Sequence, residues 1–220
     1  MPPLPRIEHA DLPEHMTWDD LERLPEEIAA QIELWEGRVV WVRRGPAEHQ
    51  DAMFSMTGAL KRAAHTASSV SPEQCWRAAL ETNVFLGSSG KSDFLTPDFL
   101  VYRCPKRPFD DVRADDVALV GEVLSPSNTP NEVETKKTRY AGAGIPWYWE
   151  VALSRSTGAI DLVRAYALES EPGRLPEGVR PLREANYLLA GEWSPADAAD
   201  ITIDFPFSIR IPWSELNAES

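Results

Sequence analysis

Two carboxylates of this sequence stand where their apolar neighbours predict burial. Glu122 lies inside VALVGEVLS, residues 117–125, and Asp98 opens an apolar run directly after Pro97. A buried carboxylate without a partner costs several kcal/mol, so each must be hydrogen-bonded, ion-paired, protonated or bound to a metal. Two carboxylates at the ends of adjacent strands can hold one hard divalent cation, and Mg²⁺ is commonly bound through carboxylates and several waters.

Two further residues would complete such a site. Lys136 lies on a predicted helix just after the Glu122 strand, where a strand–loop–helix connection can turn it back toward the strand end. A lysine there could orient or deprotonate an attacking water and neutralise charge on a scissile phosphate. Glu33 begins the first strand of a predicted hairpin and offers a third carboxylate.

Each of these residues also has an ordinary structural interpretation. Glu33 suits a solvated strand position, Asp98 after a proline suits a turn, and Glu122 suits a structural salt bridge. Lys136 and Lys137 share their helix with acidic residues, which is typical of a solvated, ion-paired face. The order and spacing of the residues, rather than any one of them, favour the metal site.

The first half of the chain predicts the elements that carry Glu33. Thr17 is a good N-cap for a short helix. Apolar and polar residues alternate over 32–42 around Glu36-Gly37, which predicts a hairpin with this acidic-Gly pair at its turn. A long helix is expected after Pro46, because Met53, Met56 and Leu60 recur at helical spacing.

The second half predicts the elements that carry the other candidate residues. A helix is expected from about Glu132 to Ala143, ended by Gly144. A loop is expected over 171–182, and Trp213 to Leu216 favour a short terminal helix. Strands are expected at 76–86, 96–103, 117–125, 145–153 and 160–168, with less regular strand patterns in YLLAGEW and ITIDFPFSIRI.

This order of elements predicts one mixed α/β domain, with helices packed on each face of a central sheet. Residues 1–16 are expected to form a loosely ordered arm, and 17–220 a single domain with a core at 17–168 and a C-terminal extension at 169–220. The 220 residues suit one domain with a substantial core.

Composition sets limits on location and partners. No apolar run is long enough for a membrane span, and the N-terminus lacks the pattern of a signal peptide, so a cytoplasmic location and no membrane partner are expected. Cys75 and Cys104 are interpreted as buried thiols rather than a disulfide or a metal pair. The net charge of -13 is unusual for a protein that grips DNA through phosphates.

Other chemistries find little support in the sequence. The four histidines show no HExxH or other zinc spacing. GSSGKS, residues 87–92, lacks the spacing of a phosphate-binding loop and is interpreted as a turn.

Three segments carry a resemblance to a known family. TPDFLVY, GEVLSPSN and KKTRYAGAGIPWYWEV resemble the Uma-type family of restriction endonucleases, which belongs to the PD-(D/E)XK nuclease superfamily. The opening MTWDDLERLPEE and IELWEGRVV resemble the family's first helix and hairpin, and His49-Gln50 falls where the family often has a His-Gln pair. The resemblance covers roughly residues 16–165, and the run from Asp98 to Trp149 is its specific part.

The resemblance implies a restriction-endonuclease-like central mixed sheet flanked by helices, and Mg²⁺-dependent cleavage of nucleic acid, with DNA as the expected substrate and Mn²⁺ as a substitute ion. Asp98 would match the family's PD aspartate and Glu122 its second acidic ligand, with the backbone carbonyl of Val123 as a further ligand. Lys136 would match the helical lysine, and Glu33 the glutamate of the opening hairpin.

One departure and two alternatives stay open. The superfamily's lysine should follow the glutamate by two residues, but Leu124 stands there, and Lys137 is a substitute for Lys136 that the spacing to Tyr140 does not favour. The alternatives are a nuclease fold that no longer cuts and serves as an interaction module, and a regulatory subunit in which Glu122 and Lys136 form a structural ion pair. A homodimer is expected by analogy with other nucleases of this fold.

Overall fold

A computed structural model describes residues 12–42, 45–71, 73–87, 89–124, 128–169 and 185–217. Its helices are α1 (Trp18–Leu21), α2 (Glu26–Ala29), α3 (Ala47–Val70), the 3-10 helix η2 (Ala114–Asp116), α4 (Pro130–Gly142) and α5 (Trp213–Leu216). Its strands are β1 (Ile32–Trp35), β2 (Arg38–Trp41), β3 (Trp76–Leu80), β4 (Val84–Phe85), β5 (Phe94–Leu95), β6 (Phe99–Arg103), β7 (Val112–Arg113), β8 (Val117–Leu124), β9 (Trp147–Leu153), β10 (Ile160–Glu169), β11 (Asn186–Trp193), β12 (Asp200–Ile203) and β13 (Ile209–Pro212).

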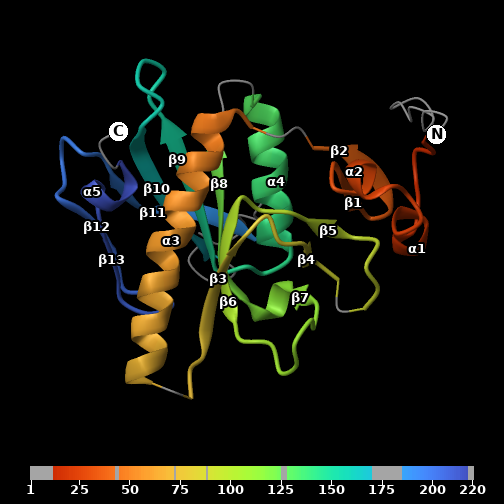
Figure 1. Ribbon diagram of the computed structural model, residues 1–220, viewed down its shortest axis with the longest axis horizontal. Helices are drawn as coiled ribbons and strands as arrows, with labels where there is room; N and C mark the ends of the chain where they lie inside the picture. Colours follow the sequence, from red (N-terminus) through yellow and green to blue (C-terminus); the bar gives the residue numbers. More distant parts are fainter. Residues whose placement is uncertain are drawn as a thin grey trace, which may run out of the picture.

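The centre of the molecule is a six-stranded mixed sheet with the strand order β11-β10-β9-β8-β6-β3. β8 and β9 are parallel, and the other neighbouring pairs are antiparallel. Two parallel neighbours need a crossover connection, and α4 provides it. Figure 1 shows α3 (orange) and α4 (green) on either side of this sheet, which confirms the expected mixed sheet flanked by helices.

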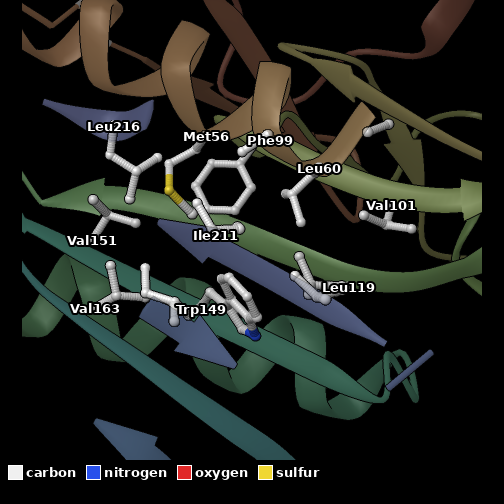
Figure 2. Close-up of a cluster of buried hydrophobic side chains, with 14 of the residues drawn as sticks. Met56, Leu60, Phe99, Val101, Leu119, Trp149, Val151, Val163, Ile211 and Leu216 are labelled. Carbon is white, nitrogen blue, oxygen red and sulfur yellow. The ribbon is translucent and has the colours of Figure 1, made fainter. Parts of the chain in front are cut away.

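Alternation along β8 divides the core between these two helices. Leu119 packs in the cluster that includes Met56 and Leu60 of α3, whereas Val120 packs in the cluster that includes Tyr140 of α4. Figure 2 shows the α3 side, with Met56 and Leu60 gathered against Trp149 and other strand residues. Successive side chains of a strand point to opposite faces, so even-numbered residues of β8 face α4.

A second sheet carries the hairpin that holds Glu33. Its strand order is β2-β1-β5-β4-β7. Glu36 and Gly37 link β1 and β2 with positive φ values of 53° and 84°, as a tight hairpin turn requires. The predicted hairpin and its turn are therefore confirmed.

The C-terminal extension contributes to the main core. β11 pairs with β10 as an outer strand of the central sheet, and β12 and β13 form a two-stranded sheet. Ile201, Ile211, Trp213 and Leu216 belong to the same buried cluster as Met56 of α3. The predicted loop over 171–182 lies outside the described residues.

Several boundaries differ from the prediction. The strand expected at 76–86 is divided into β3 and β4, and Glu81 between them has a positive φ of 41°. Helix α4 begins at Pro130 rather than at Glu132, because Thr129 forms a capping box with Glu132. In both cases local turn and cap chemistry sets the boundary, while the type of element is as expected.

Part of the expected N-terminal arm is docked onto the hairpin. Met16 donates its backbone N–H to Gly37, Glu14 accepts one from Val39, and His15 forms a bridge with Arg38. Residues 12–16 therefore depart from the expectation of a loosely ordered segment, because backbone pairing with β2 holds them. Residues 1–11 lie outside the described residues.

The interpretation of the two cysteines as thiols was wrong, because Cys75 and Cys104 form a disulfide. They lie directly beyond the last pair of the antiparallel strands β3 and β6, Trp76 and Arg103. Their Cα atoms are 5.3 Å apart, within the range that a disulfide spans. The two residues are remote in sequence, so only the strand pairing brings them together.

In the part of the chain that the structure describes, no helix has both the length and the apolar character needed to cross a bilayer.

Candidate active site

The strand pairing directs two glutamates toward α4. Glu122 of β8 and Glu150 of β9 are register partners in the parallel pair. Both stand on the same strand faces as Val120 and Tyr148, which pack against Tyr140 of α4. The alternation that buries these apolar neighbours therefore also buries the two carboxylates beneath the helix.

Glu122 is hydrogen-bonded and ion-paired to α4. The hydroxyl of Tyr140 donates to Glu122 Oε1 at 2.7 Å, and Lys136 Nζ lies 3.3 Å from both carboxylate oxygens. Only 9% of Glu122 is exposed. Burial raises the pKa of Glu122 to about 7, opposed by the charge of Lys136 and reinforced by the negative charge of Asp98.

Asp98 lies across from Glu122. Phe99 pairs with Gly121, so extending the antiparallel register by one step sets Asp98 opposite Glu122 on the α4 side. Asp98 Oδ2 accepts the backbone N–H of Val123 at 2.6 Å, and Asp98 Oδ1 lies 3.2 Å from His49 Nε2.

His49 of α3 takes its electrostatic character from this contact. Burial lowers the pKa of His49, but the hydrogen bond to Asp98 and the negative charges of Asp98, Glu122 and Glu81 outweigh it, so the pKa is raised overall. The imidazole therefore favours its charged form beside the carboxylates.

Glu33 is locked in place by three donors. Glu33 Oε1 accepts the backbone N–H of Thr96 at 2.9 Å, and Oε2 accepts Nε1 of Trp35 at 2.9 Å. Lys136 Nζ lies 3.4 Å from Oε1, and only 1% of Glu33 is exposed. With both oxygens engaged by the protein, Glu33 is set up to hold Lys136 rather than to accept a new partner.

Lys136 bridges the two sheets by contacting Glu122 on β8 and Glu33 on β1. Burial alone would lower the pKa of Lys136, but the negative charges of Glu122, Glu33 and Asp98 outweigh it and hold the pKa well above the ordinary value. This side chain is consequently a charged donor near neutral pH, not a base.

Lys137 serves a different glutamate. Its Nζ lies 3.1 Å from Glu150 Oε1, while the hydroxyl of Tyr166 donates to Glu150 Oε2 at 2.8 Å. Lys137 Nζ also lies 3.3 Å from the ring centroid of Tyr166. Of the two neighbouring lysines, Lys136 is the one that reaches the Glu122 carboxylate.

The donor set suits one hard divalent cation. Among the described residues, no three His, Cys, Asp or Glu side chains form a group that could hold a metal ion alone. Asp98 and Glu122 offer two carboxylates whose mutual repulsion raises the pKa of Glu122, a repulsion that a cation would relieve. Mg²⁺ typically takes one or two carboxylates and completes its shell with water, so these residues fit it.

Two neighbours of the site were given no role from the sequence. His49 contacts Asp98, and Tyr140 donates to Glu122. His49-Gln50 had been noted only as a point of family resemblance, and Tyr140 only as a spacing marker for Lys136. A Cβ atom at Gly45 would lie 2.3 Å from Cγ of His49, so the glycine leaves room for the imidazole.

The candidate residues line one pocket of about 650 Å³. Its walls come from β1, β2, β8 and α4, and from the N-terminal part of α3. The charged residues Glu33, His49, Glu122 and Lys136 line it together with aliphatic and aromatic side chains.

Comparison with known proteins agrees with this architecture. The chain is similar to a solved structure titled "Crystal structure of a putative nuclease belonging to DUF820 from Anabaena variabilis ATCC 29413", with 18% identity and a TM-score of 0.55. The likeness covers 91% of this chain and 97% of that chain, and it shows a shared fold. No curated protein matches the chain. The family Uma2, described as "Putative restriction endonuclease", matches residues 18–177, and this chain belongs to that family.

Proposed function

We propose that the chain is a Mg²⁺-dependent endonuclease that hydrolyses phosphodiester bonds in DNA. The observation that carries the proposal is the meeting of Asp98, Glu122 and Lys136 in one pocket, drawn from separate elements. Family membership supports a nuclease, and the structure from Anabaena variabilis is itself titled a nuclease. The metal and the substrate are the parts that the proposal adds.

The carboxylates of Asp98 and Glu122, with the backbone carbonyl of Val123, would hold the ion. Bound there, a divalent cation supplies Lewis-acid polarisation of the phosphate and a more acidic bound water. The backbone N–H of Val123 orients Asp98 from one side, and His49 orients it from the other. The protein thus fixes the ligand geometry before any ion arrives.

Lys136 would act on the substrate through its positive charge. The glutamates around it keep it protonated, so it can donate hydrogen bonds to a phosphate oxygen and stabilise the charge that develops there. Glu33 holds Lys136 from the hairpin side and is a positioning residue, since both of its oxygens already accept protein donors.

A cleavage assay tests the proposal. Plasmid and oligonucleotide DNA are incubated with the protein in Mg²⁺, in Mn²⁺ and in EDTA. Cleavage should require a metal and should fall below detection in the Asp98→Asn/Glu122→Gln double variant. Asp161→Asn, an exposed carboxylate on β10, is the matched control and should cut like the wild type. Undiminished cleavage by the double variant, or cleavage in EDTA, would sink the proposal.

The net charge of -13 favours one alternative, a nuclease fold that binds metal without cutting. A strongly acidic chain is a poor general binder of phosphate backbones. Metal binding that depends on Asp98 and Glu122, together with no hydrolysis of any nucleic acid offered, would support this alternative over the endonuclease.

A further inference from the structure

The pocket in front of the carboxylates is charged at its base and apolar toward solvent. Glu33 and Glu122 are almost completely buried, with 1% and 9% exposed. Four aliphatic side chains that also line the pocket are half-buried and therefore lie nearer to solvent; they are Val40, Val42, Leu124 and Val133. A ligand that reaches the carboxylates must pass along these apolar side chains.

The aliphatic residues come from three elements. Val40 is the cross-strand partner of Glu33 on β1, so both side chains stand on the same face of the hairpin. Leu124 ends β8 two residues after Glu122, and Val133 lies in the first turn of α4, one turn before Lys136. A site that only gripped phosphates would gain nothing from apolar side chains beside each of its charged residues.

Such a lining suits a nucleobase or a sugar beside the phosphate. Enzymes that bind an unpaired nucleotide commonly hold its base between apolar or aromatic side chains. Bases of every type offer a flat face for such contact, so the binding tolerates many sequences.

The size of the pocket restricts what can enter. Its volume of about 650 Å³ equals that of a cube roughly 9 Å on an edge, narrower than the ~12 Å major groove of B-DNA. Pockets of roughly 300–1,000 Å³ take small organic molecules, a range that suits one nucleotide. A continuous duplex keeps its bases stacked inside, so it cannot feed a nucleotide to the buried carboxylates without local unpairing.

We infer that the pocket takes one unpaired nucleotide, with its phosphate toward Glu122 and Lys136 and its base or sugar against Val40, Leu124 and Val133. The substrate class is then single-stranded or locally unpaired nucleic acid rather than intact duplex. This inference rests on the proposed function.

The first test compares substrates on the wild-type protein. One sequence is offered as a single strand, a blunt duplex and a duplex with a central unpaired bubble, all with Mg²⁺ or Mn²⁺. The single strand and the bubble should be cut at least tenfold faster than the blunt duplex, with cuts inside the bubble. Cleavage of the blunt duplex at an equal or higher rate overturns the inference while leaving the proposed function standing.

The second test fills the pocket. Val133→Trp should lower the ratio between oligonucleotide cleavage and hydrolysis of bis(p-nitrophenyl) phosphate at least tenfold, because the small diester needs no base site. Val40→Trp fills the same space from β2, and it provides the measurement if Val133→Trp does not fold. Val70→Trp, at the exposed end of α3, is the control and should leave the ratio within about twofold of wild type.

The outcomes separate the two claims. An unchanged ratio in a folded pocket variant overturns the nucleotide pocket. If the wild type hydrolyses neither the oligonucleotide nor the small diester with any metal, the proposed function itself fails, and the inference fails with it. Anisotropy of labelled oligonucleotides in Ca²⁺ adds a readout that needs no turnover, and the single strand should bind at least fivefold more tightly than the duplex.

Discussion

At the scale of single residues, neighbouring lysines have separate partners. Lys136 contacts Glu122 and Glu33, while Lys137 contacts Glu150 and Tyr166. Consecutive positions on a helix differ in direction by about 100°, so one residue along α4 selects a different strand of the sheet. The two lysines therefore make a matched pair for testing which contact matters to catalysis.

Lys136→Met should lower phosphodiester hydrolysis about 100-fold or more, because the charge that would stabilise the phosphate is lost. Lys137→Met should change the rate less than about fivefold, since its partner Glu150 is not among the residues that line the pocket. Both rates are measured on one oligonucleotide at saturating Mg²⁺, and Lys136→Arg reports how far charge alone suffices. Equal losses in the two Met variants would contradict separate roles.

Gly45→Ala should disturb the site without removing any charged group. The added Cβ would lie 2.3 Å from Cγ of His49, so the imidazole must move away from Asp98. Loss of such a supporting contact typically weakens metal affinity about tenfold or more. Calorimetric titration with Mn²⁺ measures it. Gly142→Ala is the control, because nothing lies within 4 Å of a Cβ atom there; matching affinities in the two variants would exclude a role for His49.

At the scale of elements, β6 has chemistry at both of its ends. Asp98 precedes the strand at the pocket, and Cys104 follows it in the disulfide with Cys75. The six residues from Asp98 to Cys104 span roughly 20 Å of extended chain. The crosslink therefore fixes the β3–β6 edge of the sheet from far outside the active site.

Replacing both cysteines should affect stability but not catalysis. The bond closes a loop between residues 29 apart in sequence, for which the chain-entropy model gives about 3–4 kcal/mol. The Cys75→Ser/Cys104→Ser variant should melt roughly 10 °C below the wild type. Hydrolysis at 20 °C should stay within about twofold. Alkylation of unreduced wild-type protein followed by mass spectrometry checks the bond directly, and two modified cysteines would contradict it.

The elements could be predicted from the sequence where a local pattern was strong. The alternation around Glu36-Gly37, the apolar run that contains Glu122 and the helix that carries Lys136 were all placed correctly. The gathering of candidate residues rested on order along the chain and on the resemblance, and the strand register accounts for it physically.

Other features depend on pairing between distant segments, which no local pattern encodes. The Cys75–Cys104 disulfide follows from the register of β3 against β6. The three donors that lock Glu33 come from β1, the Thr96 backbone and α4. Likewise, the contact of His49 with Asp98 joins a helix to a strand 49 residues away.

At the scale of the whole molecule, the charge of -13 and a site for nucleic acid are compatible if few phosphates are contacted. Affinity that relies on phosphate neutralisation falls steeply with salt, by about one power of salt concentration for each neutralised phosphate. A pocket that holds one nucleotide through apolar contacts and one metal-bound phosphate needs little of that attraction. An acidic surface would also disfavour non-specific binding along duplex DNA.

The central claim is that Asp98 and Glu122 hold a divalent cation, and thermal denaturation with and without Mn²⁺ tests it most directly. At a metal concentration about 100-fold above its dissociation constant, binding to the folded state adds about 2.7 kcal/mol, a shift of roughly 5–10 °C for a chain of this size. The account predicts that shift for the wild type and for Asp161→Asn, and its loss in Asp98→Asn. An equal shift in Asp98→Asn, or no shift in the wild type at any Mn²⁺ concentration, would contradict it.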